Sequence, residues 1–262
     1  MIRPNGWGAS ISLHSIQYNG LTLDSIVEAL KPDWWMNWSH RTYGASADGF
    51  IPMLWSNTWG DNAVRRGLLD MPGRTWLIHN EPHRPDQANL TPEEAADDVK
   101  RFMTVAWEAG VEFQAALGGC GVVDETTDGI EWMRDFMYLL RRTGLSRSSY
   151  MHFHGYRFNS VEQARRGLDS FMTLWDEVGL GAPIVISEFC AENTSPANQM
   201  KVMDEVRQWI ADGKISGAAW FCANDGGAGW PLSTLCNVPT GKNTGLPVTL
   251  TETGKHWVDL KG

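Results

Sequence analysis

The sequence predicts an α/β fold, a single (β/α)8 TIM barrel domain that covers residues 1–262. Short apolar runs alternate with amphipathic stretches along the whole chain, which is the pattern of parallel α/β proteins. Two of the runs, 75–79 and 183–186, each lead to a glutamate at the end of a strand, Glu81 and Glu188. The 107 positions from one to the other correspond to about three βα units, so the pair fits strands four and seven of a barrel. A doubly wound sheet is disfavoured because no Gly-rich phosphate loop follows the first strand.

The first third of the chain supplies three strands and two helices. Apolar or alternating runs predict strands at 6–13, 33–38 and 50–55, and helical periodicity predicts helices at 21–30 and 61–69. Pro52 interrupts the third strand, and proline cannot donate a ladder hydrogen bond. We therefore expect this strand to be the least regular.

The helix after the fourth strand has the clearest boundaries. Thr91 can cap it, Pro92 suits its first turn, and Glu94 completes a capping box. Gly110 ends the helix. Its apolar face consists of Val99, Phe102, Met103 and Ala106.

The C-terminal half repeats the same alternation. Strands are predicted at 113–117, 150–154, 183–189 and 217–221, and helices at 130–143, 160–178, 195–210 and 251–260. Ser160 and Ser195 are good N-caps, and Gly144 and Gly179 are good terminators. No linker or low-complexity segment divides the chain, so one domain is expected.

The net charge of −9 argues against nucleic acid and against an anionic membrane surface as partners. No apolar run is long enough for a transmembrane helix, and residues 1–6 contain no apolar core of a signal peptide. We expect a monomer without membrane association. The four cysteines have no CxxC spacing, so neither a zinc site nor a disulfide framework is indicated. Cys190 and Cys222 follow neighbouring strands and could pair, but free thiols are the expectation.

Two glutamates at one rim suit retaining glycoside hydrolysis, in which one carboxyl protonates the leaving oxygen and the other attacks the anomeric carbon. Their environments must then differ, since one is protonated while the other is ionised. Asn80 could hydrogen-bond the sugar 2-hydroxyl, and Trp220 at the end of strand eight could form the floor of the subsite. The 14 tryptophans also suit stacking against sugar rings.

At these residues the chain resembles glycoside hydrolase family 128, a family of compact endo-β-1,3-glucanases in the retaining (β/α)8 clan. The similar motifs are Trp34-Trp35-Met36-Asn37-Trp38, Phe50-Ile51-Pro52-Met53-Leu54-Trp55, Asn80-Glu81-Pro82, the run 87–96, Ser187-Glu188-Phe189 and Ala219-Trp220-Phe221. The resemblance implies that Glu81 is the acid/base and Glu188 the nucleophile. It implies that the cleft is lined by Asn37, Trp38, Trp55, Asn80 and Trp220.

The chain departs from the family pattern at three places. It reads His152-Phe153-His154 where the family often has His-Trp-Tyr, His83 where an aspartate commonly follows the Asn-Glu-Pro triplet, and Ser187 where Thr is usual. Residues 1–32 and 118–127 match poorly. The departures leave both carboxylates in place but affect positions that are expected to contact the sugar.

His152 and His154 share one face of their strand, with His154 nearer the rim. A His-x-His pair is also a metal-ligand spacing, so a metal-dependent hydrolase is a rival reading. We expect His154 to hydrogen-bond the nucleophile or the sugar, and His79 to point toward the helix layer. Trp230, in the loop after strand eight, is either a stacking platform or a loop anchor.

The expected function is therefore hydrolysis of β-1,3-glucan, internally and with retention, with no cofactor and no metal. One alternative is an endo-hydrolase of another β-glycan, such as mixed-linkage glucan or β-mannan. Another is a non-catalytic barrel that binds glycan, which would have no need for a matched pair of carboxylates. The polymeric substrate suggests a secreted or extracellular protein, although the chain contains no signal peptide.

Overall fold

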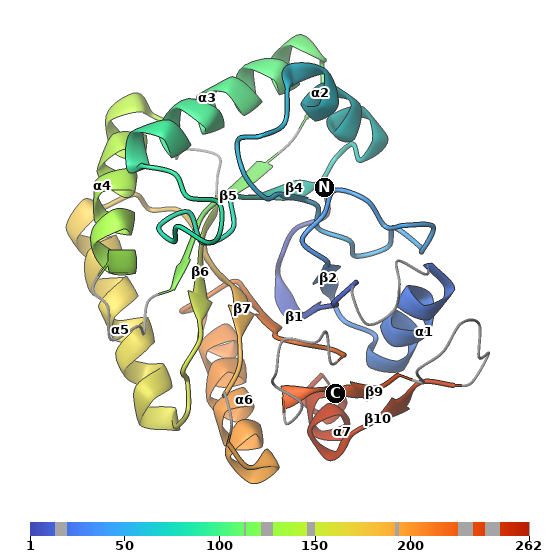
Figure 1. The fold of residues 1–262 in the computed structure, drawn as a ribbon. Helices are drawn as coiled ribbons and strands as arrows, with labels where there is room; N and C mark the ends of the chain where they lie inside the picture. The colour runs from blue at the N-terminus through green and yellow to red at the C-terminus, as the bar shows by residue number, and fades with distance from the viewer. Residues whose placement is uncertain are drawn as a thin grey trace.

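The chain forms a parallel eight-stranded sheet that is rolled into a barrel and surrounded by helices (Figure 1). The computed structural model describes residues 1–13, 20–112, 114–121, 128–145, 150–191, 194–224, 233–238 and 247–261. The strand order is β2-β1-β8-β7-β6-β5-β4-β3, and every neighbouring pair is parallel. This order confirms the predicted (β/α)8 barrel.

The observed elements follow the predicted ones closely. The barrel strands are β1 (Gly6–Ser10), β2 (Trp34–Met36), β3 (Met53–Leu54), β4 (Thr75–Ile78), β5 (Gln114–Gly121), β6 (Tyr150–Gly155), β7 (Ile184–Phe189) and β8 (Gly217–Trp220). The helices are α1 (Gly20–Leu30), α2 (Asp61–Asp70), α3 (Pro92–Glu108), α4 (Asp128–Thr143), α5 (Val161–Val178), α6 (Pro196–Ala211) and α7 (Glu252–Asp259). A small antiparallel pair, β9 (Cys236–Asn237) and β10 (Thr249–Leu250), was not predicted, because two-residue strands carry no readable alternation.

The barrel closes between β2 and β3, and the contact between these two strands differs from that in the other seven pairs of neighbouring strands. These strands share no ladder; a single parallel bridge joins Trp35 to Phe50. Trp35 N donates to Gly49 O at 2.9 Å, and Ile51 N donates to Trp35 O at 2.8 Å. Pro52 follows directly, and its missing N–H is consistent with the short β3, as expected from the sequence.

Side chains alternate between the barrel interior and the layer under the helices. The interior is filled by a compact cluster that consists of Trp34, Met36, Ile51, Met53, Leu77, Ala116, Tyr150, Val185 and Ala219. A larger apolar cluster lies between the strands and the helices. Because Tyr150 points inward, the same period places His152 and His154 inside the barrel, toward the carboxyl ends of the strands.

The predicted helix caps are present. Thr91 Oγ1 accepts from Glu94 N at 3.2 Å, while Glu94 Oε2 accepts from Thr91 N at 2.8 Å, which forms the capping box of α3. Ser160 Oγ accepts from Gln163 N at the start of α5. Gly179 ends that helix with a left-handed φ of 65°.

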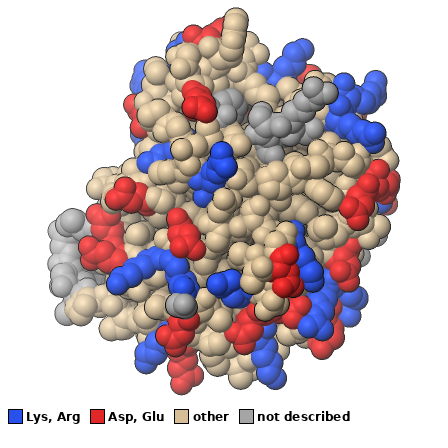
Figure 2. Space-filling model, turned by 180° about the vertical axis from the view of Figure 1, so that it is seen from behind, with Lys and Arg blue, Asp and Glu red and all other residues tan. Residues whose placement is uncertain are grey.

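All four cysteines are buried free thiols, which agrees with the expectation for Cys190 and Cys222. Among the described helices, none combines the length and apolar character that a bilayer span requires. Acidic and basic side chains are intermixed over the face seen in Figure 2.

Candidate active site

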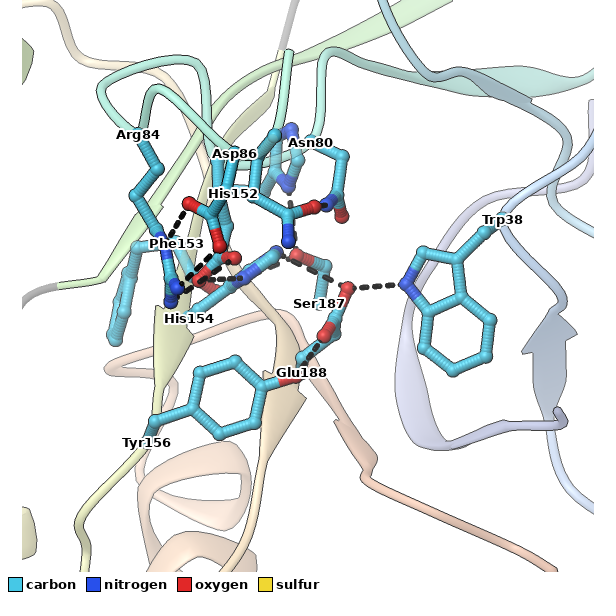
Figure 3. A network of polar contacts seen from close by, with 12 residues as sticks. Trp38, Asn80, Arg84, Asp86, His152, Phe153, His154, Tyr156, Ser187 and Glu188 are labelled. Carbon is cyan, nitrogen blue, oxygen red and sulfur yellow. Dashed lines mark hydrogen bonds and ion pairs between the residues drawn. The ribbon is translucent and has the colours of Figure 1, made fainter. Parts of the chain in front are cut away.

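The structure brings Glu81 and Glu188 to the carboxyl-terminal rim of the barrel, with one histidine, His154, between them. Figure 3 shows His154 beside Glu188. Glu81 lies three residues beyond β4, and Glu188 lies near the end of β7. His154 on β6 is fully buried; its Nδ1 lies 3.6 Å from Glu81 Oε1, and its Nε2 lies 3.3 Å from Glu188 Oε1. The two carboxylates predicted from chain spacing therefore share one polar cluster.

The backbone that presents these groups is unusual. Trp38, His79 and Glu81 all have left-handed φ values, of 58°, 69° and 43°. Such a conformation costs a non-glycine residue on the order of 1–3 kcal/mol and is common in active sites. Glu81 is held there because its N–H donates to Gly119 O at 3.1 Å and its carbonyl accepts from Arg84 N at 3.0 Å.

Donors converge on the Glu188 carboxylate. Trp38 Nε1 donates to Oε1 at 2.7 Å, and the Tyr156 hydroxyl donates to Oε2. Trp38 and Tyr156 approach from opposite sides in Figure 3, and Phe221 meets both rings edge-on with centroids 5.5 Å apart. Hydrogen bonds to both oxygens favour the ionised carboxylate.

Tyr156 was not predicted from the sequence, because the strand was expected to end at residue 154, whereas β6 extends to Gly155. The available signal was its position two residues after His154, which continues the alternation of β6.

The charged groups shift one another's pKa values. Burial raises the pKa of Glu188, and the negative charge of Glu81 adds to this, against the opposing effect of His154. Burial also acts to raise the pKa of Glu81, but His154 and Arg84 outweigh it, so that the pKa of Glu81 is lowered. For His154 burial acts to lower the pKa, but the two carboxylates outweigh burial and raise it.

Arg84 borders the cluster on the Glu81 side. Its Nη1 lies 3.6 Å from Glu81 Oε2, and its guanidinium forms two hydrogen bonds with Asp86, of 3.1 and 3.0 Å. Asn80 Nδ2 donates to Gln87 Oε1 at 3.0 Å, which fixes the amide. The buried Oδ1 of Asn80 has no hydrogen-bond partner among the described residues, so Asn80 remains a candidate for a sugar contact.

His152 on β6 links β4 and β7 beneath the two carboxylates. Its Nε2 lies 3.3 Å from Ile78 O and its Nδ1 lies 2.7 Å from Ser187 Oγ. Because a carbonyl only accepts, Nε2 carries the proton and the Ser187 hydroxyl donates to Nδ1. The described residues contain no group of three or more potential metal ligands, so the metal-dependent alternative gains no support.

We expect His152 to make the protein sensitive to acid. Burial lowers the pKa of His152 from 6.5 to about 3. Because its folded pKa lies below its unfolded pKa, its contribution to stability is full above pH 6.5 and is lost as pH falls from 6.5 toward 3. The loss is about 1.4 kcal/mol per pH unit in that window. Urea unfolding from pH 7 to 5 should show a shallower pH dependence for His152→Asn than for the wild type; equal slopes would contradict this.

His79 points toward the helix layer, as predicted. Its Nε2 lies 2.9 Å from Asp98 Oδ2 on α3, and both side chains are buried. Asp98 Oδ1 in turn accepts from the Arg101 guanidinium, at 2.9 and 2.5 Å. This pair attaches the loop that carries Glu81 to α3.

Two predicted cleft residues do not line the cleft. Trp220 is fully buried, donates from Nε1 to Ser233 O at 2.7 Å, and packs edge-on against Phe189. The reason is strand alternation: Ala219 faces the barrel interior, so Trp220 faces the helix layer, whereas the ring of Phe221 lies against Trp38 and Tyr156. The prediction that Trp220 forms the subsite floor was wrong.

Asn37 is also a structural residue, since only 1% of it is exposed. Its Nδ2 donates to Arg41 O at 2.9 Å and its Oδ1 accepts from Ser39 N at 3.2 Å, so both ends of the amide hold the turn that contains Trp38. Trp55 is half-buried beside the barrel clusters, and its role as a sugar contact stays a prediction. Trp230 lies outside the described residues.

We expect Trp220→Phe to behave as a core substitution. Loss of the larger ring and of the bond to Ser233 should destabilise the protein by about 1–3 kcal/mol, with KM for glycan near the wild-type value. Urea unfolding and initial rates measure the two effects. A several-fold rise in KM without loss of stability would place Trp220 in the cleft after all.

Comparison with known proteins identifies the family and supports the fold. Residues 16–252 match the glycosyl hydrolase catalytic core family. A search of curated protein sequences finds no match. The solved structures that resemble the chain include a GH128 (subgroup I) endo-β-1,3-glucanase from Amycolatopsis mediterranei in complex with laminarihexaose, with 19% identity, a TM-score of 0.67 and coverage of 97% of this chain and 99% of that one.

Two further structures show the same fold. A GH128 (subgroup II) endo-β-1,3-glucanase from Sorangium cellulosum has 22% identity, a TM-score of 0.65 and coverage of 99% and 98%. A GH128 (subgroup VI) exo-β-1,3-glucanase from Aureobasidium namibiae has 18% identity, a TM-score of 0.67 and coverage of 89% and 91%. The family match spans most of the chain, and the chain therefore belongs to the glycosyl hydrolase catalytic core family and is a glycoside hydrolase.

Proposed function

We propose that the protein hydrolyses β-1,3-glucan with retention of configuration, with Glu188 as the nucleophile and Glu81 as the acid/base. The observation that carries the proposal is the pairing of two buried rim glutamates with different surroundings. Glu188 receives donors on both oxygens, which suits a group that reacts as an anion. Glu81 lies at the end of the strand where leaving-group protonation is expected from the family resemblance.

In the first step the Glu188 carboxylate forms a bond to the anomeric carbon while the bond to the leaving oxygen breaks, and Glu81 supplies the proton to that oxygen. In the second step Glu81 takes a proton from water while the water oxygen bonds to the anomeric carbon, and the bond from that carbon to Glu188 breaks. Trp38 and Tyr156 keep the carboxylate oriented in both steps. Phe221, Trp38 and Trp55 offer apolar ring surface for the sugars.

The β-1,3 linkage is supported by the structural neighbours, whose names specify β-1,3-glucanases. We propose internal cleavage, as in the Amycolatopsis and Sorangium enzymes, with exo-action as in the Aureobasidium enzyme as the alternative. Reducing-sugar release from laminarin, mixed-linkage glucan, cellulose and mannan tests the linkage. The products of reduced laminarin test the mode: a ladder of oligosaccharides means internal cleavage, and a single short product means exo-action.

The nucleophile assignment has its own test. A 2-deoxy-2-fluoro laminaribioside with a good leaving group should inactivate the enzyme, and peptide mass spectrometry should find the sugar on Glu188. If the sugar were found on Glu81 instead, Glu81 would be the nucleophile and Glu188 the acid/base. Binding of laminari-oligosaccharides without any turnover would instead support the glycan-binding barrel.

Because the substrate is a polymer, we propose that the protein acts outside the cell. We also propose that it is a monomer.

A further inference from the structure

The role proposed for Glu81 raises a question about its proton. A general acid must carry a proton before the leaving oxygen is protonated. Yet Glu81 lies between two basic side chains, with His154 Nδ1 at 3.6 Å from Oε1 and Arg84 Nη1 at 3.6 Å from Oε2. Both neighbours favour the ionised carboxylate, so the substrate-free protein holds this proton elsewhere.

His154 is the residue placed to hold it. Its ring is fully buried and spans the two carboxylates, with Nδ1 toward Glu81 and Nε2 toward Glu188. Only the imidazolium form has an N–H on both sides, so only that form can face two carboxylates without a repulsive lone pair. Neither nitrogen satisfies hydrogen-bond geometry with any described residue, so the contacts with Glu81 and Glu188 are ion-pair distances of 3.6 and 3.3 Å, and no other described group bonds the ring.

The other groups around His154 leave this arrangement intact. Arg84 also acts on His154, and the His154 ring lies near the rings of the neutral His152 and of Tyr156. Within the part of the chain that the structure describes, the carboxylates that act on it are Glu81 and Glu188. The cluster therefore contains two carboxylates and one imidazole that lies between them and can carry a proton, with Arg84 at its edge.

We propose that His154 and Glu81 share one acid proton, and that His154 delivers it to Glu81 when a sugar occupies the cleft. The inference rests on the proposed function of Glu81. The His154 Nδ1–H bond breaks as the Glu81 Oε1–H bond forms, which leaves a neutral imidazole and a neutral carboxyl. His154 keeps its Nε2 proton, which still faces Glu188 Oε1. Glu81 then passes the proton to the leaving oxygen.

The second half of the reaction restores the starting state. Glu81 is an anion after the leaving group departs, and His154 is neutral. Glu81 takes a proton from the attacking water, and that proton returns to His154 Nδ1 when the ester to Glu188 is broken. His154 thus acts through Glu81 as a positioning and proton-holding residue, and it does not contact the sugar.

The test compares two substrates that differ in their need for acid. Laminari-oligosaccharides need a protonated leaving oxygen, whereas 2,4-dinitrophenyl β-laminaribioside does not. In His154→Gln, kcat/KM on the oligosaccharides should fall by about 10²–10⁴-fold, while the aryl substrate stays near its wild-type rate. The matched control is Tyr156→Phe, which removes a donor to Glu188 and should slow both substrates alike.

A structural role for His154 would give a different result. Equal losses on both substrates, with an unchanged alkaline limb in the pH profile for oligosaccharides, would overturn the proposal. If His154 holds the proton, that limb moves to lower pH in the variant. A wild-type protein that is inactive on both substrates would refute the proposed function itself, and the two failures are therefore distinct.

A measurement on the wild type removes dependence on the folding of a variant. Nitrogen-15 NMR of the histidine rings should show His154 as an imidazolium in the free protein at pH 6. With a non-hydrolysable thio-linked laminari-oligosaccharide bound, it should become a neutral ring protonated at Nε2. A ring in the same protonation state with and without the ligand would exclude the transfer.

Discussion

Glu188→Gln will lower kcat on laminarin by about 10⁴-fold or more, because an amide cannot attack the anomeric carbon. The substitution keeps the size of the side chain, and its oxygen can still accept from Trp38 Nε1 or from the Tyr156 hydroxyl. Binding of laminari-oligosaccharides should therefore persist. Reducing-sugar assays measure the loss, and isothermal titration calorimetry measures the binding.

Glu177→Gln is the matched control for this experiment. Glu177 lies on α5, 42% of its side chain is exposed, and its partners Arg134 and Tyr138 are on α4, away from the rim. Its kcat should equal that of the wild type. A Glu188→Gln protein that hydrolyses laminarin at more than a trace rate would remove Glu188 from the chemistry.

Asp98→Ala should produce the largest loss of stability, about 3–5 kcal/mol in the free energy of unfolding. Asp98 is the buried anion that His79 and Arg101 both contact, and its removal leaves His79 buried without a partner among the described residues. Since His79 lies two residues before Glu81, the same change should loosen the catalytic loop and reduce kcat. Urea unfolding and laminarin hydrolysis measure the two effects.

Asp61→Ala is the control that distinguishes the buried His79–Asp98 pair from the exposed Arg101–Asp61 ion pair. Asp61 bonds the other side of Arg101 at 2.8 Å, but 66% of its side chain is exposed. Exposed ion pairs contribute about 0–1 kcal/mol, so this variant should unfold close to the wild type. If the two variants lost equal stability, the contribution of the buried His79–Asp98 pair would be negligible.

The sequence was sufficient for the barrel and for the two carboxylates. Caps such as Thr91 and Ser160 act over three residues, so a local pattern predicts them reliably. Glu81 and Glu188 were found because strand ends in a parallel barrel meet at one rim, and chain spacing alone indicates which strands carry them. The direction of His79 followed from strand alternation and was confirmed by Asp98.

Sequence reasoning failed where one residue of register decides the outcome. Trp220 and Phe221 are adjacent aromatic residues, and only the parity of β8 determines which one faces the cleft. Asn37 was predicted to line the cleft, yet its amide hydrogen-bonds the backbone of a local turn. Short polar side chains often bond nearby backbone groups in this way. His154 was expected near the nucleophile and lies 3.3 Å from Glu188, but its additional approach to Glu81 depends on three strands at once, so no local pattern could reveal it.

The single bridge between Trp35 and Phe50 has a consequence for how the barrel opens. Every other pair of neighbouring strands is held by a ladder, so local opening should begin at this seam. In native-state hydrogen exchange, the amides of Trp35 and Ile51 should exchange faster than those in the ladder of β6 and β7. Trp38 follows one side of the seam and Trp55 the other, so these fluctuations would widen the barrel where two candidate sugar-binding tryptophans stand.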